Sequence, residues 1–130
     1  MKIGLVAEVK WEVREVCRRL KLTSTNPRDG LWGANLNDHS IRLCLSGMIP
    51  SVSRERVDRF LESHQVDVMI CSGLAGALWP EIEVGDLIVQ SEDSSLVGLA
   101  EQALKDARIP FHVGPLVTVA KPVLISASRR

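Results

Sequence analysis

The feature that most constrains the fold of this chain is an apolar run, residues 66–71, that leads directly into a loop of small residues at 72–77. A second apolar run follows at residues 84–89. Both runs are rich in branched residues and bounded by turn-forming residues, which is typical of buried strands. Small residues at the carboxyl end of a strand let the backbone approach a ligand closely, and open α/β sheets bind ligands there. The segment therefore predicts a sheet and a binding site at its edge.

Strands and helices are expected to alternate along the rest of the chain. Residues 3–9 are typical of a buried strand, residues 30–36 and 40–45 of a hairpin, and residues 112–119 of a last strand. Three amphipathic helices are expected, each with one apolar face directed inward. The inward residues of the first are Val13, Val16, Cys17 and Leu20, and those of the second are Val57, Phe60 and Leu61. The third helix, capped by Asp93 or Ser94, is expected to face inward through Leu96, Leu99, Ala100, Ala103, Leu104 and Ala107. The order predicts one α/β domain over residues 1–130, with three αβα layers and a twisted, mixed, largely parallel sheet.

The loop of small residues offers backbone N–H groups that no bulky side chain covers. Such groups can cradle a phosphate or the hydroxyls of a ribose. The loop is neither a Walker loop, since no G-K-[ST] follows the glycines, nor a dinucleotide fingerprint, since no G-x-G-x-x-G opens a helix. A tight turn with positive φ at its glycines is the structural alternative, and spacing alone leaves both interpretations open.

Composition excludes several classes of partner. Sixteen basic and sixteen acidic residues cancel and are scattered, so neither nucleic acid nor an anionic membrane is expected as a partner. The first apolar run is too short for a signal peptide or a membrane span, which predicts a cytoplasmic protein. The odd number of cysteines without a C-x-x-C pair predicts buried, reduced thiols at Cys17, Cys44 and Cys71, and the isolated histidines predict no metal site.

Four blocks of sequence, taken together and in this order, point to a known family. They are MKIGLVAEVKWEV at the amino terminus, LSGM at 45–48, CSGLAGALWPEIEVGDLIV at 71–89 and HVGPLVTVAKPVLISA at 112–127. The chain resembles the nucleoside phosphorylase and nucleosidase superfamily, which contains purine and uridine phosphorylases and methylthioadenosine/S-adenosylhomocysteine nucleosidase, and it looks closest to hopanoid-associated phosphorylases. The resemblance implies a phosphorylase-like fold, a small-molecule nucleoside substrate and no cofactor, with phosphate as a co-substrate if water is not the nucleophile.

The resemblance also implies roles for single residues. Glu12 matches the carboxylate that nucleosidases of this family use to activate water, although a solvated helix carboxylate is the structural alternative. Ser46 and Gly47 match a Ser-Gly pair that begins a site loop, and the alternative for Ser46 is a hydroxyl that caps a turn. The substrate-binding loop is expected to consist of Ser72, Gly73, Leu74, Ala75 and Gly76. Many members carry serine where Leu74 stands, so Ser72 would have to supply that hydroxyl.

Two motifs of the family find no match in residues 1–130: a Met-Glu motif that binds the ribose hydroxyls and a Ser-Asp motif that protonates the purine. The resemblance therefore implies the amino-terminal portion of such an enzyme, incomplete or weakly active by itself. A missing part of the sheet would leave an unpaired strand edge, so a homo-oligomer is expected. A non-catalytic nucleoside-binding module and an oligomeric assembly module are the alternatives to an enzyme.

Overall fold

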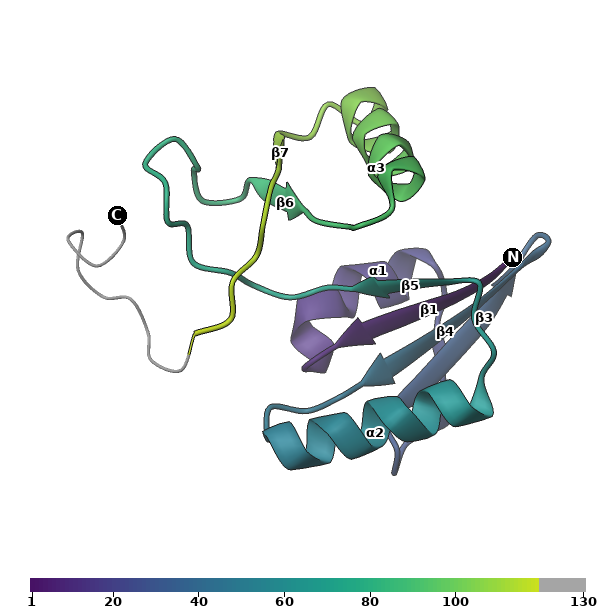
Figure 1. Ribbon diagram of the computed structural model, residues 1–130. Helices are drawn as coiled ribbons and strands as arrows, with labels where there is room; N and C mark the ends of the chain where they lie inside the picture. The colour runs from purple at the N-terminus through teal and green to yellow at the C-terminus, as the bar shows by residue number, and fades with distance from the viewer. Residues whose placement is uncertain (120–130) are drawn as a thin grey trace. The chain divides into compact units, whose positions relative to one another are not determined.

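The computed structural model of the chain describes residues 1–119, which fall into two compact units (Figure 1). The first unit is Met1–Leu74 and the second begins at Ala75. Residues 120–127 of the closing sequence block lie outside the described residues. The single domain expected over residues 1–130 stays a prediction.

The first unit is built on a five-stranded mixed sheet with the strand order β2-β3-β4-β1-β5. Its strands are β1 Lys2–Ala7, β2 Thr23–Asn26, β3 Leu31–Leu36, β4 His39–Leu45 and β5 Val68–Cys71. β1 pairs in parallel with β4 and β5, whereas β2, β3 and β4 pair antiparallel. The predicted mixed sheet and the hairpin are thus confirmed. β2 was not predicted because its sequence, TSTN, is entirely polar and has no apolar alternation.

Helices cover both faces of this sheet, which confirms the three-layer α/β class (Figure 1). The 3₁₀ helix η1, Lys10–Val13, and α1, Arg14–Arg19, pack on one face, where a buried cluster forms from Ala7, Val13, Cys17, Leu22, Ile41 and Leu43. α2, Pro50–Ser63, packs on the other face through Phe60, which is 2% exposed. A Cβ added to Gly4 would lie 3.3 Å from the Phe60 ring, so a glycine in β1 permits this close helix packing.

In the first unit, two helix positions and one cysteine that were predicted to be buried are exposed instead. Val16 is on the outer side of α1, because η1 and α1 pack into the buried cluster mainly through Val13 and Cys17. Leu61 is exposed because consecutive helical residues point about 100° apart, and Phe60 takes the inward direction. Cys71, unlike the buried Cys44, is exposed at the end of an edge strand.

The second unit contains a parallel strand pair joined by a helix. β6, Leu87–Val89, pairs with β7, Phe111–Val113, and α3, Ser94–Asp106, connects them. Asp93 is the N-cap of α3, as predicted, and its carboxylate accepts the N–H of Ser95 at 2.8 Å. Both strands are shorter than predicted, and for β6 the reason is a turn at residues 83–86 in which Gly85 has φ +100°. The predicted inward stripe of α3 is wrong at Leu99, which is 67% exposed, and at Ala103 and Ala107, which are also exposed.

Candidate functional site

The predicted site residues of the first unit gather at one edge of its sheet. β4, β1 and β5 are parallel, so their carboxyl ends meet there. Backbone bonds hold the following residues in place: Ser46 donates its N–H to Ala7 at 2.8 Å, and Ser72 donates to Val6 at 2.9 Å. The structure thus brings together segments that are far apart in the sequence. We call this group, Glu8, Glu12, Ser46, Gly47 and Ser72, the carboxyl-edge site.

Glu12 lies in η1, directly after β1, and its carboxylate folds back toward the end of that strand. Its Oε2 accepts the backbone N–H groups of Glu8 at 3.2 Å and of Val9 at 3.4 Å. These two bonds hold the carboxylate at the sheet edge and cap the start of η1, so the catalytic role of Glu12 stays a prediction. Its Oε1 forms no hydrogen bond within residues 1–119 and is available to accept a proton from water.

Ser46 and Gly47 form the turn that follows β4. The Ser46 hydroxyl is buried and donates to the carbonyl oxygens of Ala7 at 3.4 Å and Gly47 at 3.3 Å. This geometry agrees with a hydroxyl that caps a turn. Gly47 has φ +81°, a conformation that residues with a Cβ rarely adopt. The pair therefore shapes the backbone of the site, and Gly47 is a glycine for a conformational reason.

The loop of small residues is extended and open. Gly73 and Gly76 do not have positive φ, and a Cβ at either would meet no atom within 4 Å. The tight-turn alternative is therefore wrong for these glycines. Leu74 is 77% exposed at the end of the first unit, and Ala75 and Gly76 are exposed residues at the start of the second. The Ser72 hydroxyl forms no hydrogen bond in the described part of the chain, so it is free to bind a ligand.

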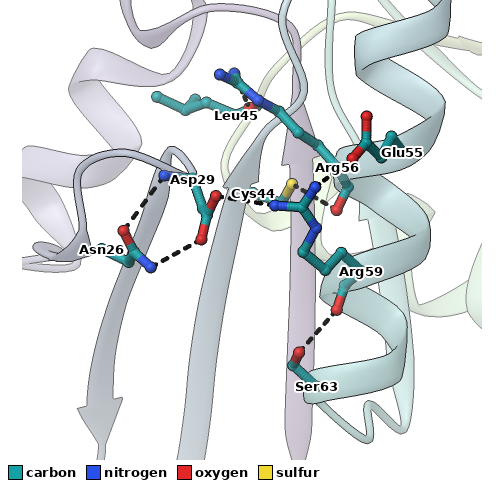
Figure 2. Close-up of polar contacts among 8 residues, drawn as sticks. All are labelled: Asn26, Asp29, Cys44, Leu45, Glu55, Arg56, Arg59 and Ser63. Carbon is teal, nitrogen blue, oxygen red and sulfur yellow. Dashed lines mark hydrogen bonds and ion pairs between the residues drawn. The ribbon is translucent and has the colours of Figure 1, made fainter.

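Arg56 is a residue of this edge that the sequence interpretation missed. It lies on α2, and its Nη1 donates to the carbonyl oxygen of Leu45 at 3.2 Å (Figure 2). The same atom would lie 3.6 Å from a Cβ built on Gly47. A helical-wheel signal was present, because Arg56 stands four residues before Phe60 and therefore on the same face of the helix. An arginine on an otherwise apolar inward face was the available clue.

A second set of contacts braces the end of β4. Gly30, with φ +65°, accepts the N–H of Leu45 at 2.9 Å. A Cβ on Gly30 would lie 2.9 Å from the Leu45 carbonyl oxygen, so only glycine permits this approach. Asp29, next to Gly30, accepts a hydrogen bond from Nη1 of Arg59 on α2 at 3.2 Å (Figure 2). The β2-β3 turn and α2 together hold the strand end from which Ser46 and Gly47 continue.

The two buried thiols are poor nucleophiles, and the described residues hold no cluster of metal ligands. Burial raises the pKa of the Cys44 thiol, which keeps it protonated and a poor nucleophile. Burial likewise raises the pKa of Cys17. In residues 1–119 no group of three His, Cys, Asp or Glu side chains is arranged to hold a metal ion. No helix in that range has the length and hydropathy that crossing a membrane requires.

A mixed sheet covered by helices, with a backbone-built site at the carboxyl edge of its parallel strands, matches the family found by comparison. The family model described as Phosphorylase superfamily matches residues 2–92, so the chain belongs to the phosphorylase superfamily. The resemblance inferred from the sequence is thereby confirmed. Membership is consistent with the expectation that no cofactor is needed.

The solved structures similar to this chain include nucleosidases. The 5'-methylthioadenosine/S-adenosylhomocysteine nucleosidase of Campylobacter jejuni superposes with a TM-score of 0.80 at 22% identity, over 99% of this chain and 69% of that one. The corresponding enzyme of S. pneumoniae gives 0.72 at 22% identity, over 88% and 62%. The nucleosidase of Helicobacter pylori gives 0.78 at 15% identity, over 99% and 72%. These superpositions show the fold, and the chain spans about two thirds of each relative.

Proposed function

We propose that this chain is a nucleoside phosphorylase or nucleosidase-type protein that cleaves the N-glycosidic bond of a purine or related nucleoside. The observation that carries the proposal is the convergence of Glu12, Ser46-Gly47 and Ser72 at one sheet edge, within a chain of the phosphorylase superfamily. The fold is shared with enzymes whose names specify 5'-methylthioadenosine and S-adenosylhomocysteine as substrates. An adenine nucleoside is accordingly the first substrate to test.

The edge offers groups suited to this reaction. Cleavage builds positive charge on the sugar, and a carboxylate near the anomeric carbon stabilises it. With water as nucleophile, Oε1 of Glu12 takes a proton as the water oxygen bonds to the anomeric carbon. The carbon–nitrogen bond breaks, its electron pair stays on the base, and the base nitrogen takes a proton from solvent, while Glu12 returns its proton to solvent. The free hydroxyl of Ser72 and the uncovered backbone at Gly73 are proposed to contact the sugar.

Weak activity of residues 1–130 is part of the proposal. The Met-Glu and Ser-Asp motifs find no match in this sequence, and the chain spans 62–72% of the relatives compared above. Loss of a positioned general acid typically reduces a rate about 10²- to 10⁴-fold. We therefore expect nucleoside binding to be easier to detect than turnover.

Isothermal titration with adenosine, inosine and 5'-methylthioadenosine tests the proposal, together with chromatography of the released base. Gly73→Val is the informative variant, because an added Cβ there meets no protein atom within 4 Å and the backbone φ is not positive. The fold should survive while the ligand is obstructed. Gly98→Val is the matched control, since Gly98 has equally open surroundings but lies on α3. Saturable heat that disappears only in Gly73→Val supports the proposal, and absence of heat with every nucleoside overturns it.

The same measurements separate the alternatives. A non-catalytic nucleoside-binding module would bind without releasing base, and an assembly module would do neither.

Self-association and a cytoplasmic location stay proposals. Self-association is supported by β5, which pairs only with β1 in the described part of the chain and so has an unpaired side. Sedimentation velocity of the full chain tests it.

A further inference from the structure

An open cavity of about 200 Å³ lies at the end of the sheet where the parallel strands begin, near the amino terminus (Figure 1). β1 runs from Lys2 at this cavity to Ala7 beside the carboxyl-edge site, and at about 3.3 Å per residue its ends lie roughly 16 Å apart. The cavity is therefore separate from the site of the proposed reaction. None of the described residues that line it is acidic, and six have polar side chains: Lys2, Ser40, Arg42, Ser63, His64 and Gln65. We call it the amino-edge cavity.

Strand pairing places two basic side chains of this cavity on the same face of the sheet. β1 and β4 pair in parallel, with Lys2 beside Ser40 and Gly4 beside Arg42. Residues two apart along a strand point to the same face, and a Cβ built on Gly4 would meet the ring of Phe60 on α2. Lys2 and Arg42 therefore lie on the face of the sheet that α2 covers.

Arg42 is half-buried, and only one nitrogen of its guanidinium is bound within the protein. Nη1 donates to the carbonyl oxygens of Ile41 at 2.8 Å and Ala34 at 3.2 Å, and it lies 3.5 Å from Oδ1 of Asn35. The stem packs against Gly33 of β3, where a Cβ would be 3.0 Å from Cδ of Arg42. Nε and Nη2 form no hydrogen bond or ion pair within residues 1–119. Adjacent N–H donors of this kind bind two oxygens of one oxyanion.

His64 closes the cavity at the end of α2. Its Nδ1 lies 3.2 Å from the carbonyl oxygen of Phe60, which also accepts the backbone N–H of His64 at 2.9 Å. These contacts occupy a carbonyl at the negative end of the helix and leave Nε2 without a partner in residues 1–119. Asp67, which follows the cavity lining in the sequence, accepts the backbone N–H of Lys2 at 2.6 Å. The side chains of Lys2 and Arg42 form no ion pair in the described part of the chain.

We propose that the amino-edge cavity binds a doubly charged oxyanion, a phosphate or sulfate group, between Arg42, Lys2 and His64. Two permanent positive charges balance a dianion, and the free edge of Arg42 supplies paired, charge-assisted hydrogen bonds. The cavity is smaller than the roughly 300–1,000 Å³ of sites for drug-sized molecules, so it suits an anionic group and not a whole nucleoside. The inference does not depend on the proposed function.

Titration of the full chain with sodium sulfate, followed by ¹H–¹⁵N NMR, tests the inference and locates the ligand. The backbone amide signals of Ser40, His64 and Gln65 should shift and saturate at millimolar sulfate. Sodium chloride at equal ionic strength corrects for screening of charges. Equal shifts with chloride and sulfate overturn the inference, as do shifts confined to Gly47 and Ser72 of the carboxyl-edge site.

Variants of the two basic residues test their role. Arg42→Met should weaken sulfate binding about tenfold to a hundredfold, as expected for lost hydrogen bonds to a charged group. Lys2→Met should weaken it severalfold, and because Lys2 is exposed this variant keeps the test valid if Arg42→Met does not fold. Arg54→Met is the matched control, since it removes the same charge from an exposed position of α2 outside the cavity. Wild-type sulfate affinity in both Arg42→Met and Lys2→Met overturns the inference.

Glycerol 2-phosphate distinguishes the two sources of such an anion. Affinity equal to that of sulfate, with shifts of the same amide signals, assigns the cavity to the phosphate group of an organic ligand. Lower affinity assigns it to a free inorganic anion. Failure of every nucleoside to bind would overturn the proposed function and leave this anion site standing.

Discussion

Gly47 donates its backbone N–H to the carbonyl oxygen of Glu8 at 2.8 Å, and this bond joins the residue pair after β4 to the first residue after β1. The two residues stand 39 positions apart, as do Ser46 and Ala7 in the neighbouring bond. Because Glu8 also donates its N–H to Glu12, the same contact connects the Gly47 turn with the proposed catalytic carboxylate. The site is held mainly by backbone groups.

Gly47→Val should damage both the turn and the site. With φ +81° a valine is strained, at a cost of about 1–3 kcal/mol in the free energy of unfolding. We expect lower stability in urea and loss of nucleoside binding by titration. Gly98→Ala, in the helix α3, should instead raise stability by roughly 0.5–1 kcal/mol. Nucleoside binding by Gly47→Val at wild-type affinity would contradict this role of the turn.

Glu12→Gln separates catalysis from structure at the same edge. The amide oxygen of glutamine can still accept the N–H groups of Glu8 and Val9, so the melting temperature should hardly change. The release of base should fall about 10²- to 10⁴-fold if this carboxylate is the base. Glu15→Gln is the control, because Glu15 is exposed on α1 and binds Arg18 and Arg19. Those hydrogen bonds lower the pKa of Glu15 to about 2, yet its loss should leave base release unchanged.

Phe60→Ala should destabilise the first unit. Phe60 is 2% exposed and packs over Gly4, so truncation leaves a cavity and costs about 3–5 kcal/mol. Leu61→Ala, at the adjacent and 43% exposed position, should cost within about 0.5 kcal/mol. Urea unfolding followed by tryptophan fluorescence gives both values. Equal losses of unfolding free energy in the two variants would mean that α2 does not pack on the sheet through Phe60.

The Asp86–His112 pair predicts acid sensitivity of the second unit. The His112 ring lies 2.8 Å from the Asp86 carboxylate, and this hydrogen bond, with that from the Glu83 N–H, lowers the pKa of Asp86 below its usual 3.8. A lowered pKa in the folded state means that the ionised carboxylate stabilises the fold above pH 3.8 and that this contribution is lost as the pH falls toward the lowered value. Thermal unfolding from pH 7 to 2 should show a stability difference from Asp86→Asn that vanishes in acid. A difference independent of pH would contradict this account.

Local sequence signals predicted much of the secondary structure but little of the packing. The hairpin, α2 and the Asp93 cap follow from turn residues, a proline at a helix start and a capping side chain, all of which act within a few residues. The polar strand β2 has no such signal, since it exists only because β3 offers hydrogen-bond partners. Val16 and Leu61 show the same limit, because the width of a buried helix stripe depends on what the helix packs against.

The sequence by itself determined the α/β class, the family and the candidate residues, because these depend on local patterns and on blocks of motif in a given order. Only the tertiary structure decided that Glu12, Gly47 and Ser72 share one edge, and that Arg56 joins them from the opposite face of the sheet. The physical reason is that parallel strand pairing and helix packing are long-range interactions. They act between residues that no local pattern connects.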